Sequence, residues 1–438
     1  MTFDDVLPTL LRVCETWEHA ATLQRVAVVR DLRGLVRLAV EPTEDGARHL
    51  DALGVILKRE LGPWFTGEML STRTGKQPLQ NVARRVLKTA PPWEAPRYPD
   101  LAGGQVPATA GRWQLWERRV GKQPWLEGEG GEPWPLSDGN PAVVTFYSFK
   151  GGVGRTTTLA ACALLAARAG EKVVVIDLDL EAPGLASVFG VEADQGVVDL
   201  LVDHLATEAV NLRGALQRPQ ALPDELAEHI QVIPAGRLGV SYLEKLARLD
   251  FAGSAMAPAG TEAPVQNALR ALLAKVRDEH RPRWILLDAR AGLHDLAGLS
   301  LHGLAHADVL FSRANAQGVA GLDLVLQALS RRVRSASSRV VLVHAMAPAG
   351  RPEATAEHAR LQHETYGMFT RHLYRGVSGI PEQDAEDADH QPWMIHREET
   401  IERNDRLADV VPQLTGEDYR AVWERIRLLT AAPTEGAG

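Results

Sequence analysis

A glycine-rich run with two cations is the segment of this sequence best suited to chemistry. Residues 149–158 read FKGGVGRTTT. Gly151, Gly152 and Gly154 let the backbone turn sharply and bring its N–H groups close to an anion. A helix that starts at this point adds its positive end to the same place. The run therefore predicts a loop that cradles phosphate and is built mainly from backbone.

The two cations of the run differ in position. Lys150 precedes the glycines, and Arg155 occupies the place where a phosphate loop normally carries lysine. Arginine keeps the positive charge of lysine, but its planar fork needs more room than a compact ammonium. We therefore expect phosphate binding to survive this exchange better than the geometry needed for fast phosphoryl transfer.

Carboxylates follow two apolar runs further along the chain. Residues 172–176 read KVVVI and continue into Asp177 and Asp179, and residues 284–287 read WILL and end in Asp288. Short unbroken apolar runs are typical of strands buried on both faces of a parallel sheet, whose carboxyl ends meet at the ligand crevice. An acid in such a place is often only a helix cap, and a glycine loop alone is often only a tight turn. The order of the glycine loop and the two acid-terminated strands, however, predicts a phosphate-binding loop, one acid that orients the attacking water and one acid that binds Mg²⁺ directly or through water.

The elements that must position these groups alternate between strand and helix patterns. Strand patterns occupy 142–147, 172–176, 230–233, 284–287, 309–311 and 340–343. Helical spacing of apolar residues occupies 197–205, 242–249, 267–280, 322–333, 357–372 and 419–429. This alternation predicts a doubly wound, mostly parallel α/β sheet over residues 141–430.

The remaining segments predict a second, smaller domain. Residues 1–90 read as an α+β unit of unknown role. Its patterns are a helix over 7–19, a hairpin of 26–29 with 35–40, and a helix over 47–61 that ends at Gly62-Pro63. Residues 91–140 form a Pro/Gly/Trp-rich connector whose tryptophans we expect to pin it to the main domain, and residues 431–438 form a disordered tail.

Composition limits the classes of function. The chain has 438 residues, with 48 basic against 56 acidic side chains and a net charge of −8. That balance gives no support to a surface that coats DNA or an anionic membrane, although a local basic patch is compatible with it. Cys14 and Cys162 match no metal or disulfide spacing, and no apolar stretch is long enough to span a membrane. We therefore expect a cytoplasmic protein.

The motifs together resemble those of the deviant Walker A ATPases related to ParA and MinD, a SIMIBI-class family of P-loop NTPases. The matching segments are 150–157 (KGGVGRTT), 177–184 (DLDLEAPG) and 285–292 (ILLDARAG). The resemblance covers the order of elements over 141–430 and is residue-specific only in these motifs. Chains with the KGGVGR form resemble a distinct bacterial branch that is associated by analogy with signalling or conflict (defence) systems.

The resemblance implies ATP and Mg²⁺ as cofactors and assigns a role to each motif residue. Thr156 would place its hydroxyl on Mg²⁺, and Asp288 would hold a water on the metal. Asp179, with Asp177, would orient the attacking water. Lys150 would reach nucleotide in a partner subunit when ATP draws two protomers together. The positions expected to contact the nucleotide are Gly151, Gly152, Val153, Gly154, Arg155, Thr156, Thr157, Asn315 and Pro381.

Recognition of the base is less defined by the sequence. No Asn-Lys-x-Asp run is present to read guanine, so ATP is expected over GTP. In the family that the chain resembles, residues after the later strands frame adenine, which indicates Asn315 and Pro381. Asn315 equally fits the cap of a helix that starts near Gly318. Arg290 faces a partner subunit or pairs with an acid.

The sequence therefore predicts an ATPase of slow turnover that acts as a dimerising switch for an unidentified partner protein. Two alternatives remain open. One is a positioning ATPase of the ParA or MinD type that acts on DNA or a membrane. The other is a nucleotide-bound scaffold that does not hydrolyse ATP.

Overall fold

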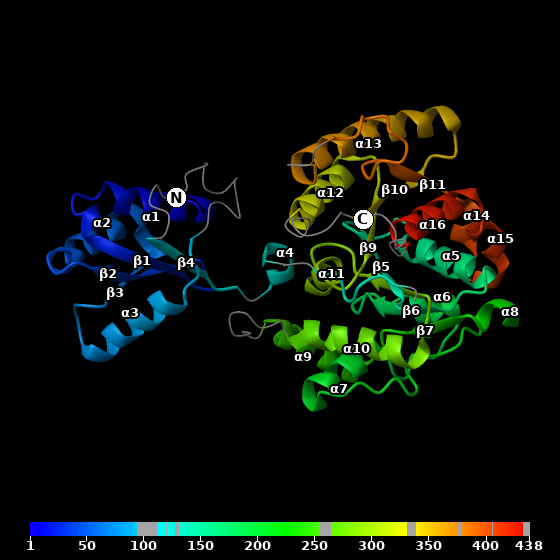
Figure 1. The fold of residues 1–438 in the computed structure, drawn as a ribbon, viewed down its shortest axis with the longest axis horizontal. Helices are drawn as coiled ribbons and strands as arrows, with labels where there is room; N and C mark the ends of the chain where they lie inside the picture. The colour runs from blue at the N-terminus through cyan, green and yellow to red at the C-terminus, as the bar shows by residue number, and fades with distance from the viewer. Residues whose placement is uncertain are drawn as a thin grey trace. The chain divides into compact units, whose positions relative to one another are not determined.

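The chain folds into two compact units that divide between Val120 and Gly121 (Figure 1). The computed structural model describes residues 1–93, 112–119, 121–127, 131–137, 139–254, 264–330, 339–374, 379–404 and 406–431. All but the first residue of the tail expected at 431–438 lies outside these residues, as does the middle of the connector expected at 91–140.

The first unit is a four-stranded sheet in the order β3-β2-β1-β4 with helices on both faces. Its elements in chain order are α1 (Phe3–Thr16), β1 (Leu23–Arg30), β2 (Val36–Pro42), α2 (Leu50–Leu61), β3 (Phe65–Ser71), α3 (Gln77–Thr89) and β4 (Trp113–Glu117). Short 3-10 helices lie at Ala20–Thr22, Gly46–Arg48 and Gly62–Trp64. β1 and β2 are antiparallel, as the predicted hairpin requires, whereas β3 and β4 add in parallel at the two edges.

Alternation along the central strands separates the two faces of this sheet. Val26 and Val28 of β1 face the core made with α1 and α2, and Ala27 faces α3. The first helix, the hairpin and the second helix were predicted, with the first helix shifted towards the amino terminus. β3, α3 and β4 were not predicted. β3 is interrupted by Gly67 at φ 85°, and β4 lies within the segment expected to be a connector.

The second unit is a seven-stranded sheet in the order β11-β10-β9-β5-β8-β6-β7, in which every neighbouring pair is parallel. Its strands are β5 (Ala142–Ser148), β6 (Val173–Leu178), β7 (Ile230–Ile233), β8 (Trp284–Ala289), β9 (Ala307–Ser312), β10 (Val340–Ala347) and β11 (Pro392–His396). The predicted doubly wound sheet is confirmed. β11 was missed because it is short, begins with proline and is only half-buried.

Helices cover both faces of the second sheet, with a short 3-10 helix at Leu407–Val410. One face packs against α5 (Arg155–Arg168), α6 (Leu185–Phe189), α8 (Asp224–Ala227), α15 (Val411–Leu414) and α16 (Glu417–Leu429). The other packs against α4 (Gln123–Glu127), α7 (Val197–Thr207), α9 (Val240–Ser254), α10 (Pro264–His280), α11 (Asp295–Leu301), α12 (Ala316–Leu329) and α13 (Arg351–His372). The short α14 (Glu399–Arg403) precedes α15 (Figure 1). No helix in the described ranges is both long and apolar enough to cross a membrane.

The connections that follow β5 and its neighbour β9 run in opposite directions across the sheet, from β5 to β6 on one side and from β9 to β10 on the other. The strands β8, β6 and β7 lie on one side of β5, and β9, β10 and β11 lie on the other. In an open parallel sheet such a switch point leaves a crevice at the carboxyl ends of the strands. The glycine run follows β5 directly, so the fold places it at this crevice.

The start of α7 offers a test of how tightly this unit is packed. A Cβ at Gly196 would lie 2.2 Å from the carbonyl oxygen of Pro234 and 2.4 Å from the amide nitrogen of Gly236, so backbone would have to move. We expect Gly196→Ala to lower the free energy of unfolding by on the order of 1–3 kcal/mol, measured as a lower urea midpoint. Gly239→Ala is the matched control, because a Cβ at Gly239 meets open space and should leave the midpoint unchanged. Equal midpoints for both variants would contradict this packing.

Candidate functional site

The glycine loop joins β5 to α5 and is open to approach from outside. Gly152 and Gly154 have φ values of 71° and 77°, a left-handed conformation that favours glycine. A Cβ at Gly151, Gly152 or Gly154 would meet no atom within 4 Å, so the loop leaves empty space beside its backbone. The first turn of α5 starts at Arg155 with its N–H groups directed into this region. Such a loop can receive an anionic group of the size of a phosphate.

Side chains hold the loop in this conformation. The hydroxyl of Thr158 donates to the carbonyl oxygen of Gly154 at 2.9 Å. Nη2 of Arg313, which follows β9, donates to the carbonyl oxygen of Gly152 at 2.9 Å. Arg313 was not identified from the sequence, because only the fold brings β9 next to β5.

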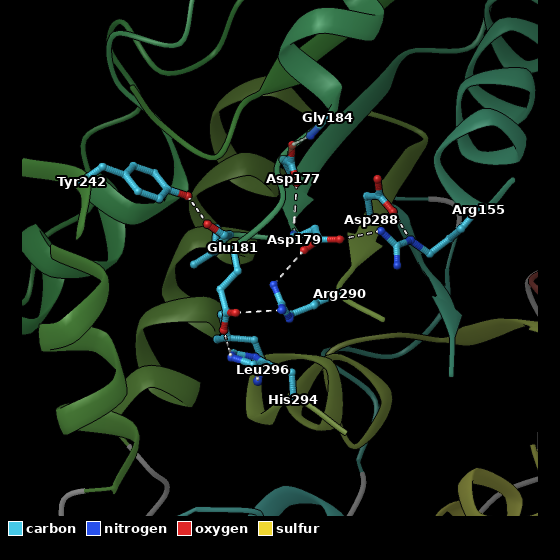
Figure 2. Close-up of polar contacts among 11 residues, drawn as sticks. Arg155, Asp177, Asp179, Glu181, Gly184, Tyr242, Asp288, Arg290, His294 and Leu296 are labelled. Atoms are coloured by element: carbon cyan, nitrogen blue, oxygen red, sulfur yellow. Dashed lines mark hydrogen bonds and ion pairs between the residues drawn. The ribbon is translucent and has the colours of Figure 1, made fainter. Parts of the chain in front are cut away.

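The three predicted carboxylates gather near Arg155, the first residue of α5 (Figure 2). Asp177 at the end of β6 is the register partner of Asp288 in β8, so the two acids are neighbours across the sheet. Asp179 follows β6 by one residue. Their exposed fractions are 0% for Asp177, 8% for Asp179 and 1% for Asp288. Buried carboxylates are costly unless they are paired or hydrogen-bonded, so the contacts of each one matter.

Arg155 joins two of these acids. Its Nε donates to Oδ1 of Asp288 at 2.5 Å, and its Nη2 donates to Oδ2 of Asp179 at 2.9 Å. The side chain of Arg155 is only 9% exposed. Burial alone would lower the pKa of this guanidinium, but the two aspartates outweigh it and raise the pKa, so Arg155 is charged. Truncating one member of such a buried pair costs about 3–5 kcal/mol.

This arrangement adds a function for Arg155 that sequence reasoning missed. The sequence indicated a phosphate contact, and the structure pairs the guanidinium with the two carboxylates. We call the ion-paired group of Arg155, Asp179 and Asp288 the arginine clamp. The sequence feature that could have revealed the clamp is the arginine at the position of the usual lysine. The several donors of an arginine can bind two carboxylates at once.

Asp288 also contacts the first turn of α5. Its Oδ2 accepts a hydrogen bond from Oγ1 of Thr156 at 2.7 Å. Burial raises the pKa of Asp288, against the lowering effect of Arg155 and Thr156. A hydroxyl and a carboxylate are hard oxygen ligands of the kind that Mg²⁺ prefers, so the pair fits this ion. No group of three or more His, Cys, Asp or Glu residues in the described ranges could hold a metal alone, so phosphate oxygens and water would complete the shell.

Asp177 is engaged by the backbone of its own loop. Its Oδ1 accepts from the amide of Asp179, and its Oδ2 accepts from the amides of Gly184 and Leu185, each at 3.1 Å. Burial and the nearby charge of Asp288 raise the pKa of Asp177 to about 7, against the lowering effect of these three donors. The carboxylate of Asp177 thus fixes the position of Asp179, whereas the sequence placed it beside the attacking water.

A second chain of polar contacts reaches Asp179 from the other side (Figure 2). Nη1 of Arg290 lies 3.4 Å from Oδ1 of Asp179, and Nη2 lies 2.7 Å from Oε2 of Glu181. Nε2 of His294 lies 2.8 Å from Oε1 of Glu181, and Nδ1 accepts from the amide of Leu296 at 3.3 Å as the cap of α11. Of the two sequence alternatives for Arg290, pairing with an acid is the one observed. Glu181 and His294 were not predicted, although Glu181 lies within the DLDLEAPG motif.

Three predicted residues lie outside the clamp. Lys150 is exposed, and its Nζ donates to Oε1 of Gln317 in α12 at 2.7 Å. Asn315 caps α12 by accepting from the amide of Gly318 at 2.8 Å, so the cap alternative is confirmed, and contact with adenine stays a prediction. Pro381 is half-buried between α13 and β11, and its contact with the nucleotide stays a prediction. Gln317 was missed because no sequence signal links it to Lys150.

Comparison with known proteins agrees with the loop and its acids. Residues 144–346 match the model of the family described as CobQ/CobB/MinD/ParA nucleotide binding domain. One relative, the septum site-determining protein MinD of Synechocystis sp., is 39% identical over 82 residues. That alignment covers 19% of this chain and 30% of the length of the relative.

Solved structures are also similar to this chain. MinD complexed with Mg-ADP from Pyrococcus horikoshii OT3 is 18% identical, with a TM-score of 0.42, over 66% of this chain and 96% of that one. A ParA family ATPase from Chlorobium tepidum TLS is 14% identical, with a TM-score of 0.41, over 65% of this chain and 98% of that one.

The family match starts within β5 and ends within β10, so it contains the glycine loop, the arginine clamp and the switch point of the sheet. This part of the chain, residues 144–346, is therefore similar to the family described as CobQ/CobB/MinD/ParA nucleotide binding domain.

Proposed function

We propose that the second unit binds ATP with Mg²⁺, hydrolyses it slowly, and acts as a dimerising switch for a partner protein in a bacterial signalling or defence system. The convergence of Arg155, Asp179 and Asp288 beside an open glycine loop carries this proposal. A cation and two acids beside such a loop could serve as phosphate ligand, water-orienting acid and metal-shell acid.

ATP binding follows from the loop and the start of α5. Backbone N–H groups from Gly151 to Thr157 would surround the phosphates, and Asn315 and Pro381 would border the adenine. Thr156 and Asp288 would hold Mg²⁺ through oxygen. The bound ion would supply positive charge that offsets the charge of the phosphates.

Slow hydrolysis follows from the clamp. In the proposed reaction Asp179 orients the attacking water, yet its Oδ2 is bound by Arg155 and its Oδ1 faces Arg290. Both oxygens of Asp179 are thus already engaged by guanidinium groups, which leaves this carboxylate less able to orient a water. Arg155 must therefore exchange Asp179 for phosphate oxygens before Asp179 can act, and this exchange adds to the barrier.

The switch role rests on Lys150. This side chain is exposed, and among the described residues a neutral contact with Gln317 holds it. Breaking one exposed hydrogen bond costs about 1 kcal/mol, so Lys150 can leave α12 at little cost when a second protomer offers nucleotide phosphates. ATP bound between two protomers would then gain a cation from each of them.

Non-hydrolysing scaffolding is a second candidate function, and the same clamp favours it. If Arg155 keeps Asp179 in every state, the nucleotide would order the domain without turnover. A positioning ATPase that acts on DNA or a membrane is a further alternative. The Synechocystis relative is a septum site-determining protein, which is in keeping with a positioning role.

The trans-acting role of Lys150 predicts a specific loss of assembly. Lys150→Ala should remain monomeric with ATP and Mg²⁺, whereas the wild type should dimerise, as measured by light scattering on a size-exclusion column. Gln317→Ala is the matched control, since it removes the resting contact of the lysine and keeps its charge. This control should dimerise as the wild type does. A dimer of Lys150→Ala with unchanged ATP dependence would rule out the role.

The clamp predicts that a smaller cation speeds the reaction. Lysine lacks the planar guanidinium with which Arg155 binds two carboxylates at once, so Arg155→Lys should free Asp179. The rate of phosphate release in a single turnover should then rise roughly tenfold, which corresponds to a barrier lower by about 1.4 kcal/mol. Asp179→Ala gives the background rate, and calorimetry checks that each variant still binds ATP. If Arg155→Lys binds ATP but is no faster than wild type, the clamp does not limit turnover. If the wild type and Arg155→Lys both release phosphate only at the background rate of Asp179→Ala, the non-hydrolysing scaffold is favoured.

A further inference from the structure

The segment that contains helix α3 of the first unit carries positive charge that no acidic residue interrupts. Residues 69–93 contain five basic side chains and no aspartate or glutamate. These side chains are Arg73, Lys76, Arg84, Arg85 and Lys88, and all five are exposed. The run lies outside residues 144–346, so it belongs neither to the glycine loop nor to the matched family domain.

The fold turns this run into one basic surface. α3 packs on the sheet through Ala83 and Leu87, which are buried against Ala27 and Ala39. At 100° per residue, Arg85 and Lys88 point away from that buried stripe, and Arg84 lies between the two sides. We call the exposed side of α3, with Arg84, Arg85 and Lys88, the basic face.

Neutral groups hold the arginines of this region in place. Arg84 donates to Oδ1 of Asn81 at 2.9 Å and to the carbonyl oxygen of Thr72 at 2.9 Å. Arg73 donates through Nε to the carbonyl oxygen of Pro42 at 2.9 Å. These contacts orient the guanidinium groups without neutralising them, because amide oxygens carry no net charge.

The acidic residues of the neighbouring strands form ion pairs with arginines of the same sheet. On the same side of the sheet, Glu41 pairs with Arg25 at 2.7 Å and Glu68 pairs with Arg37 at 3.0 Å. Among the residues that the structure describes, no carboxylate lies within salt-bridge distance of the cations on the basic face. The positive charge of α3 is therefore available to an external anion.

We infer that the basic face of α3 binds the phosphodiester backbone of nucleic acid, without need of ATP. Phosphate and sugar contacts in such complexes come from arginine and lysine together with amide and hydroxyl side chains. The exposed side of α3 offers this mixture, since Gln77, Asn81 and Thr89 accompany the three cations. No base-reading group is implied, so binding should be independent of sequence and sensitive to salt.

A lipid surface fits this helix less well. Helices that bind at a membrane surface insert an apolar face beside their cations. The apolar stripe of α3 is buried in its own unit, and the exposed aliphatic residues are Leu79 and Val82, at 48% and 46%. An anionic membrane would therefore meet mainly charge, whereas a polynucleotide meets charge and hydrogen-bonding groups together.

The test measures binding of the full chain by fluorescence anisotropy. The ligands are a labelled duplex DNA of about 24 base pairs and a labelled single-stranded RNA of similar length. Binding is measured at salt concentrations between about 50 and 200 mM. The test variant combines Arg84→Gln, Arg85→Gln and Lys88→Gln, which keep a good helix former at each position. It should weaken binding to duplex DNA at least about tenfold at low salt. It should also reduce the slope of log K against log salt by roughly 0.9 for each cation removed on duplex DNA, and by roughly 0.7 on single strands.

The matched control removes the same charge from other elements of the first unit. Arg12→Gln, Arg33→Gln and Arg59→Gln change exposed arginines of α1, the hairpin turn and α2, and should leave affinity within about twofold. A variant with Arg84→Lys and Arg85→Lys keeps the cations and should bind as wild type, which separates loss of charge from loss of fold.

Four outcomes would overturn the inference. The first is that the wild type does not bind at low salt, and the second is that the test variant and the matched control weaken binding equally. The third is binding that appears only with ATP and Mg²⁺. The fourth is tighter binding to phosphatidylserine vesicles or polyglutamate than to nucleic acid. Wild-type binding is measured first without nucleotide and then with ATP and Mg²⁺, so the inference can fail whether or not the second unit hydrolyses ATP.

Discussion

The ion pairing of one buried guanidinium with two buried carboxylates is the interaction on which the second unit depends. Asp179 and Asp288 come from different strands, and Arg155 begins the helix that follows a third. Without that cation Asp288 would lose its ion pair and Asp179 would keep only the longer contact with Arg290, so the desolvation of each buried acid, which costs several kcal/mol, would be poorly compensated. The strands β6 and β8 can therefore end in acids because α5 begins with arginine.

The same pairing links stability to function. A lysine at this position offers one compact ammonium, whereas arginine offers separate donors that reach both acids. Asp177 adds a further constraint, since three amides fix its carboxylate and through it the backbone of Asp179. A site built in this way is ordered before any ligand arrives. Its carboxylates are correspondingly less available for chemistry, because every anion that enters must compete with them for Arg155.

The sequence predicted those parts of the fold and site that depend on local pattern. Apolar runs located six of the seven parallel strands, and the acids at their ends were correctly expected beside the glycine loop. β3 was missed because Gly67 interrupts its pattern, and β11 because it is short, starts at Pro392 and is only half-buried. The contact of Lys150 with Gln317 spans 167 positions and depends on packing of α12, so no local spacing encodes it. For the same reason the sequence named Arg155 and the acids but not the pairing between them.

Charge in this chain acts locally, which is why a total of −8 is a poor guide to its surfaces. Screening limits the reach of an exposed charge to about 10 Å at 0.1 M salt. A partner at α3 therefore senses Arg84, Arg85 and Lys88, and hardly senses acids on distant elements. The clamp shows the same principle in the interior, where Arg155 matters because Asp179 and Asp288 lie within 3 Å of its nitrogens. In both units, the position of a few arginines outweighs the overall charge balance.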